Sequence, residues 1–204
     1  MVVLQQDQLG PIQDFLDWCR SSDTVRKGYR GSQNSAEAEY IPAGSVHDYF
    51  EKDDRLRATL KATHPNDDPP DAELIQNHYI RTFAILLDIG QGHMISQFLE
   101  KSTSFKDQRL PFDRHPDGFP QSTGCDLLGL FWRKQWKYCP VDMIRSMSNS
   151  MDEHSILPFC IDGDRVDSGG SANVYMINVD PDYNHLSYTN SIVDSPISSP
   201  RILS

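Results

Sequence analysis

The sequence lacks any apolar run long enough to cross a membrane. Its longest, Phe83 to Leu87, has five residues, whereas a spanning helix needs roughly 20. The first residues, Met1 to Asp7, have neither a basic start nor a long apolar stretch, so no secretory signal is expected. These absences predict a protein of the cytoplasm or nucleus that does not act at a membrane.

Positive charge is also scarce. The chain has 19 Lys and Arg residues against 29 Asp and Glu, a net charge of −10, and phosphate recognition needs clustered cations, so nucleic acid is not an expected partner. The one basic cluster, Arg133, Lys134 and Lys137, is interleaved with Trp132 and Trp136. It could grip an acidic partner, but a charged rim beside buried tryptophans is the favoured interpretation.

Cysteine and histidine are too dispersed to build a metal site. The four cysteines, Cys19, Cys125, Cys139 and Cys160, contain no Cys-x-x-Cys pair, and the seven histidines form no close pair. The sequence therefore predicts neither a zinc site nor a disulfide framework, and we expect the cysteines to be buried thiols. His78 falls on the apolar face of a predicted helix and is expected to be a hydrogen-bonded core residue.

Apolar residues recur at three- and four-residue steps over much of the chain, which is the pattern of amphipathic helices. The fold class predicted is mainly α with a small β-hairpin (α+β), with a buried core between the helices. Capping residues and glycine stops place the expected helices at Pro11 to Arg20, Ser45 to Phe50, Asp54 to Thr63, Asp71 to Leu87, His93 to Glu100 and Asp126 to Lys137.

The polar stretches between these helices suggest a division of the chain. We expect residues 1–38 to hold an N-terminal helix and a flexible linker, and residues 39–145 to form a helical domain. Residues 156–186 should form a β-hairpin, and residues 187–204, rich in Ser and Pro, a disordered tail. Within the helical domain, Phe105 to Gly124 is expected to be an irregular surface loop.

A glycine turn lies between two short β-prone stretches in the segment Arg165-Val-Asp-Ser-Gly-Gly-Ser-Ala-Asn-Val-Tyr175. In the protein-kinase pattern Gly-x-Gly-x-x-Gly-x-Val, glycines let backbone N–H groups approach the phosphates of ATP, and aliphatic residues enclose the adenine. Val166 and Val174 match the aliphatic positions here and Gly169 matches the middle glycine.

The two outer glycine positions of that pattern are occupied by Asp167 and Ala172. A carboxylate at the first position would repel a polyphosphate unless a cation intervened. On spacing alone, an ordinary hairpin with a Gly-Gly turn is therefore the favoured interpretation.

The flanking sequence strengthens the relation to kinases. The segments Ile156-Leu-Pro-Phe159 and Val179-Asp-Pro-Asp-Tyr-Asn-His185 enclose the glycine turn, and Phe131-Trp-Arg-Lys-Gln-Trp136 lies upstream. Together they resemble the entry into the kinase domain of a family of kinase-like proteins from filamentous fungi. In that family a helical N-terminal region precedes Leu-Pro-Phe, a glycine loop and a His-containing segment. The resemblance runs from about Glu39 to about Leu186.

The resemblance implies a helical N-terminal region followed by the first two strands of a kinase small lobe. It also implies that ATP would meet the chain at the glycine loop, through Val166, Ser168, Gly169, Gly170 and Val174. These positions are the candidate cofactor-binding residues.

The catalytic elements of a kinase are missing from these residues. No lysine follows Lys137, and neither His-Arg-Asp nor Asp-Phe-Gly occurs, so no catalytic residue and no metal ligand can be named. The first hypothesis is a kinase-like protein truncated before its catalytic elements and inactive alone. The alternative is a non-enzymatic helical module that binds another protein.

Overall fold

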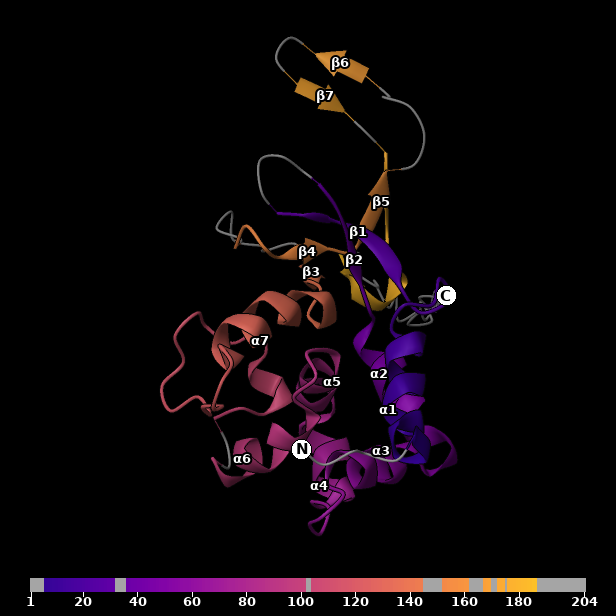
Figure 1. The fold of residues 1–204 in the computed structure, drawn as a ribbon. Coiled ribbons are helices and arrows are strands. Elements are labelled where there is room, and N and C mark those ends of the chain that lie inside the picture. Colours follow the sequence, from indigo (N-terminus) through magenta and orange to yellow (C-terminus); the bar gives the residue numbers. More distant parts are fainter. Residues whose placement is uncertain are drawn as a thin grey trace, which may run out of the picture.

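The structure, a computed structural model, describes residues 6–31, 36–101, 104–144, 152–161, 167–169, 172–174 and 176–186. For residues 6–9, 167–169 and 172–174 only the backbone is described. The helices gather in one half of the molecule and the strands in the other (Figure 1). The fold class is α+β, as the sequence predicts.

The helical half is built from seven α-helices in the described residues, and five short 3-10 turns lie along the chain. The α-helices are α1 Gln6–Trp18, α2 Ala43–Glu51, α3 Arg55–Thr63, α4 Ala72–His78, α5 Ile80–Asp88, α6 Ile95–Glu100 and α7 Leu127–Gln135. The 3-10 turns are η1 Lys52–Asp54, η2 Gly92–Met94, η3 Asp107–Arg109, η4 Trp136–Tyr138 and η5 Pro181–Tyr183.

The strands are short and form small sheets. They are β1 Arg26–Arg30, β2 Glu37–Tyr40, β3 Met143–Ile144, β4 Ile156–Leu157, β5 Phe159–Ile161, β6 Asp167–Gly169, β7 Ala172–Val174, β8 Ile177–Val179 and β9 Asn184–His185. One sheet has the order β2-β1-β4, with both pairings antiparallel. Antiparallel pairs β5-β8 and β6-β7 form the predicted hairpin region, and β3 pairs with β9 in parallel.

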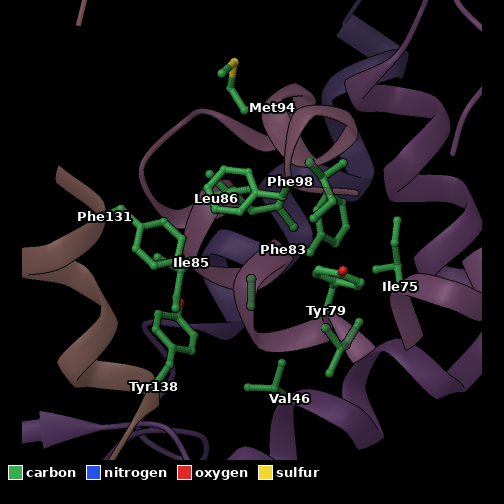
Figure 2. Packing of buried hydrophobic residues seen from close by; sticks show 14 of the residues in the cluster. Val46, Ile75, Tyr79, Phe83, Ile85, Leu86, Met94, Phe98, Phe131 and Tyr138 are labelled. Atoms are coloured by element: carbon green, nitrogen blue, oxygen red, sulfur yellow. The ribbon is translucent and has the colours of Figure 1, made fainter. Parts of the chain in front are cut away.

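Helix α5 lies at the centre of the helical half, with other helices around it (Figure 1). Seven of its nine residues are buried, because apolar side chains occur on nearly all sides of Ile80–Asp88. Figure 2 shows Phe83 and Leu86 of α5 among side chains of neighbouring segments, including Phe98 and Phe131. A helix apolar all round needs partners on every side, and this requirement organises the core.

The first turn of α5 is capped by a residue distant in sequence. The Asp107 carboxylate accepts hydrogen bonds from the backbone N–H groups of Arg81 (2.8 Å) and Thr82 (2.9 Å), and from the Thr82 hydroxyl at 2.9 Å. Burial raises the pKa of Asp107, and these hydrogen bonds offset part of that rise. The capping satisfies helix donors that would otherwise be buried without partners.

The linker predicted to extend to Ser35 is wrong over Arg26–Arg30. These residues form β1, the central strand of its sheet, paired with β2 and β4. The sequence conceals this strand because only Gly28 of its five residues is fully buried, so no apolar alternation marks it. Residues 32–35 lie outside the described residues.

The long helix predicted from Asp71 to Leu87 is two helices. Tyr79, with φ −138°, separates α4 from α5, although the apolar periodicity runs through it. The Asp71 cap is confirmed, since its side chain accepts from the N–H groups of Glu73 and Leu74. The predicted start at Ser45 is wrong by two residues, because α2 begins at Ala43.

The segment from Phe105 to Gly124 has little regular structure, as expected, but the prediction of a surface loop is wrong where Pro120 and three phenylalanines are buried. Phe105, Phe112 and Phe119 are buried in the aromatic core beside Phe98 and Phe131. Glycine and proline spacing predicts the irregular backbone and contains no information about which side chains turn inward.

Three further expectations need correction. Cys19 and Cys139 are buried, but Cys125 is half-buried and Cys160 is exposed. His78 is half-buried, and its Nδ1 has no hydrogen-bond partner among the described residues. The apolar and aromatic residues on most sides of Asp126 to Lys137 predict a largely buried helix. This prediction is wrong, because α7 buries one stripe, in which Leu127, Phe131 and Gln135 recur at four-residue steps.

None of the helices in the described residues combines the length and the hydropathy that crossing a bilayer requires. The tail expected to be disordered, residues 187–204, lies outside the described residues. The division into four segments stays a prediction.

Candidate functional site

The structure describes the glycine motif only in part. Ser168 and Gly169 belong to β6 and Val174 to β7, while Val166 and Gly170 lie outside the described residues. The register pairs Gly169 with Ala172, so Gly170 and Ser171 separate two directly paired residues. This hairpin lies at the end of the molecule farthest from the helices (Figure 1).

Hydrogen bonds connect the hairpin region to the rest of the molecule just after β8. The Asp180 carboxylate accepts hydrogen bonds from the Arg26 guanidinium (2.6 Å) and from the Tyr40 hydroxyl (2.5 Å). The hydroxyl of Tyr183, in η5, accepts a hydrogen bond from the backbone N–H of Ala43 at 2.9 Å. Strands β1 and β2 and the start of α2 are therefore all connected to the same short segment of chain.

Burial and hydrogen bonding act in opposite directions on Asp180, whose side chain is 6% exposed. Burial alone would raise the pKa of the carboxyl group, but the bonds from Tyr40 and Arg26 outweigh it, and the pKa lies below its ordinary value. The same bond raises the pKa of Arg26. This contact therefore stays ionised over the whole neutral range.

A basic cleft of about 600 Å³ lies between the β2-β1-β4 sheet and the C-terminal end of α7. We define the basic cleft by the cationic side chains that line it, which are Lys27, Arg30, Arg133, Lys134 and Lys137. Only two anionic side chains, Glu37 and Glu39, share the lining. Cations thus predominate here although the whole chain carries a charge of −10.

Within the described residues, two of the five cations have no partner that would compete with a ligand. Lys134 forms an ion pair with Asp88 at 3.2 Å, Lys137 donates to the carbonyl of Cys19, and Lys27 lies 3.7 Å from Glu37. Arg30 and Arg133 are exposed and make no ion pair or side-chain hydrogen bond within the described part of the chain. A guanidinium group can bind a carboxylate through two parallel hydrogen bonds.

One wall of the basic cleft is formed by Trp136, which is 6% exposed. It packs with Ala38, Tyr40 and Ile156 in a second apolar cluster. Its indole Nε1 is buried and has no hydrogen-bond partner among the described residues, so the indole contributes apolar ring surface to the cleft.

A buried polar chain runs behind the basic cleft. The Tyr138 hydroxyl donates to Asp88 at 2.9 Å and lies 3.4 Å from the Cys19 sulfur. Burial raises the pKa of Cys19 to about 11, and burial also raises that of Tyr138. The thiol is therefore neutral at physiological pH and unsuited to nucleophilic chemistry, so the chain is structural.

One group of side chains in the described residues has metal-ligand geometry. The ligand atoms of His47, Asp48 and Glu51 lie within 4.8 Å of one another on the surface of α2. His47 and Glu51 stand one helical turn apart and approach to 3.7 Å, which is also the geometry of an ordinary surface ion pair. The sequence alone does not mark this group, because it contains no pair of histidines or cysteines.

No family model, no curated protein and no solved structure matches this chain.

The basic cleft brings together residues that the sequence alone places apart. Arg133, Lys134 and Lys137 form the predicted basic cluster, and the structure puts them beside the tryptophan pair as a charged rim. Lys27 and Arg30, from the supposed linker, were missed. The density of cations in Arg-Lys-Gly-Tyr-Arg was the signal that could have marked this segment.

Proposed function

We propose that this chain is a non-enzymatic binding module that holds an acidic segment of a partner protein in the basic cleft. The observation that carries this proposal is the concentration of five cations around about 600 Å³ in a chain of charge −10. Charge complementarity of this kind steers association and selects partners. Arg30 and Arg133, which lack partners within the described residues, are its main contacts.

A kinase holds ATP phosphates with a strand lysine and magnesium with acidic residues, and these positions have no counterpart in residues 1–204. The relation to the fungal kinase-like family remains a proposal that rests on the motifs around the glycine turn.

A calorimetric titration with a short peptide of alternating threonine and glutamate tests the binding role. The double variant Arg30→Glu, Arg133→Glu should weaken binding by at least about 100-fold, since each lost charged contact is worth roughly tenfold. The double variant Arg57→Glu, Lys61→Glu, an exposed change of equal charge on α3, is the matched control and should leave the affinity within a few fold. Equal effects of both changes would show that only net charge matters, and would reject the cleft as the site.

ATP binding at the glycine turn is a second candidate. The pairing of β6 with β7 favours it, because two antiparallel strands at the glycine motif are the elements that a kinase glycine loop connects. A ligand that binds only the folded state raises its melting temperature, so a thermal shift with magnesium and millimolar ATP tests this candidate. If the melting temperature does not change, ATP binding is rejected and peptide binding is the remaining candidate.

A further inference from the structure

The basic cleft runs along an open edge of the sheet. In an antiparallel pair, alternate residues direct their N–H and C=O groups toward the partner strand. The backbone N–H of Arg30 donates to the carbonyl of Ala36, so Ala36 directs its backbone groups toward β1. Ile41 follows Ala36 by an odd number of residues, and its N–H points the other way, to the carbonyl of Lys137 at 2.8 Å. Glu37 and Glu39 share the parity of Ile41, so their backbone groups point outward, away from β1.

The outer edge of β2 faces the basic cleft. Lys137, which accepts from Ile41, belongs to η4 and lines the cleft together with Glu37, Ala38 and Glu39. Side chains from both faces of β2 contribute to the lining, since Ala38 is buried while the two glutamates are exposed. Within the described residues no hydrogen bond fills this edge between Glu37 and Glu39.

We propose that the partner segment binds as an extended strand added to the outer edge of β2, with its backbone paired to Glu37 and Glu39. This inference rests on the proposed function and specifies how the same cleft recognises its ligand. Strand addition draws affinity from backbone hydrogen bonds and specificity from alternate side chains. The occupant is therefore an extended acidic peptide.

The two faces of β2 dictate which peptide positions carry the negative charge. An added strand continues the pleat, so its side chains alternate between the face of Glu37 and Glu39 and the face of Ala38. Arg30 pairs with Ile156 and shares the face of Ala38. Acidic residues are thus favoured on that buried face, near Arg30 and Arg133, and neutral residues on the glutamate face, where like charges would repel.

Trp136 forms the apolar part of that face, because it packs against Ala38 and Ile156 and lines the cleft. Its Nε1 atom is itself buried, so the ring offers the peptide an apolar surface. An alternating Thr-Glu peptide satisfies all of these requirements.

Proline scanning of β2 tests strand addition. Glu39→Pro removes a backbone N–H that faces away from β1, and an edge strand tolerates proline at such a position. The variant should therefore fold, and it should bind the Thr-Glu peptide about tenfold or more weakly. Glu39→Gln keeps the N–H and is the control, with affinity unchanged or improved. Equal affinity of Glu39→Pro and Glu39→Gln, both folded by circular dichroism, would overturn strand addition.

Methylation of the peptide backbone gives a test that needs no change in the protein. One peptide carries N-methyl groups on its glutamates and another on its threonines. Because alternate N–H groups of a strand face opposite edges, only one of the two peptides should lose affinity, by about tenfold or more. Equal affinities for both peptides would reject the model even if Glu39→Pro fails to fold.

The outcomes separate this inference from the proposed function. If binding depends on Arg30 and Arg133 but neither on Glu39→Pro nor on N-methylation, the cleft binds acidic ligands without strand addition. If the arginine variant also has no effect, both proposals fail. If sedimentation shows that the chain dimerises and that Glu39→Pro abolishes the dimer, a second copy occupies the edge and the acidic-peptide assignment is overturned.

Discussion

At the residue scale, Gly28 controls how closely β1 and β4 approach. A Cβ atom built at this position would lie 2.5 Å from the carbonyl oxygen of Leu157 and 3.1 Å from the Ile156 side chain. The first of these contacts is with backbone, which cannot rotate away as a side chain can. The central position of β1 in its sheet therefore depends on the absence of a side chain here.

Gly28→Ala should destabilise the protein by about 1 to 3 kcal/mol, the usual cost of inserting atoms into a packed site. Gly44→Ala is the matched control, because nothing lies within 4 Å of a Cβ at that helical position, and it should stabilise by about 0.5 to 1 kcal/mol. Urea unfolding measures both changes. Equal stability of Gly28→Ala and the wild type would contradict the close approach.

Gln135 shows how one buried amide can anchor an irregular segment. Its Oε1 accepts from the N–H of Phe112 at 2.7 Å, and its Nε2 donates to the carbonyl of Phe112 at 2.9 Å. The side chain is fully buried. Both backbone groups of Phe112 thus find partners on α7 in place of a strand neighbour.

Gln135→Leu should cost about 2 to 4 kcal/mol, because it leaves two buried backbone groups without partners. Gln121→Leu removes an amide bonded to the Phe119 carbonyl at an exposed position, and it should change stability by less than about 0.5 kcal/mol. Chemical denaturation followed by tryptophan fluorescence compares them. A small effect at Gln135 would mean that the aromatic contacts alone hold the segment.

At the element scale, the contact among β1, β2 and the end of β8 makes stability depend on pH. The pKa of Asp180 is lowered from its ordinary value of 3.8 in the folded state. A lowered carboxyl pKa stabilises the fold at pH values above the ordinary one, and that contribution is lost as the pH falls through the folded value. Acid should therefore weaken the attachment of the hairpin region.

Asp180→Asn should reduce stability at pH 7 by on the order of 1 to 2 kcal/mol, since a hydrogen bond to a charged group contributes about that much. The difference from the wild type should shrink as the pH falls below the ordinary carboxyl value of 3.8 and through the lowered folded pKa, because the native carboxylate becomes protonated there. Asp182→Asn is the control, because Asp182 is 59% exposed and 3.1 Å from Arg26. A pH-independent difference for Asp180→Asn would show that ionisation plays no part.

At the scale of the whole molecule, the cysteines report on the integrity of the fold. Burial raises the pKa of Cys19 to about 11 and that of Cys139 to about 12, whereas Cys160 is exposed. Thiol reactivity requires access and the thiolate form. With a thiol reagent at neutral pH, Cys160 should react at once, and Cys19 and Cys139 only as the protein unfolds.

A Cys160→Ser variant should lack the fast phase and keep the slow one. The rate of the slow phase should follow the unfolding equilibrium when urea is added. Rapid reaction of all four thiols in the absence of urea would show that the core around Cys19 and Cys139 is open.

Local patterns in the sequence predicted much of the helical half. The periodicity that marks α1, α3, α5 and α7, and the Asp71 cap, depend on neighbours a few residues apart, so they are readable without a tertiary structure. The glycine stop after α5 is also local, since Gly90 adopts a positive φ of 71°.

Strand β1 and the basic cleft could not be predicted in this way. A strand with one buried residue carries no periodic signal, and its stability comes from pairing with β2 and β4, the latter far along the chain. The basic cleft likewise combines cations about a hundred residues apart in sequence, whose proximity follows only from the packing of β1 against the region of α7.

The sequence alone determined the α+β class, the positions of the main helices, the negative net charge and the absence of kinase catalytic elements, because each follows from composition or short-range spacing. Tertiary structure decided which residues meet: it turned an apparent linker into a central strand, moved three loop phenylalanines into the core and gathered scattered cations beside an open edge. Such long-range contacts depend on how whole elements bury their apolar faces against one another, and no local pattern records that.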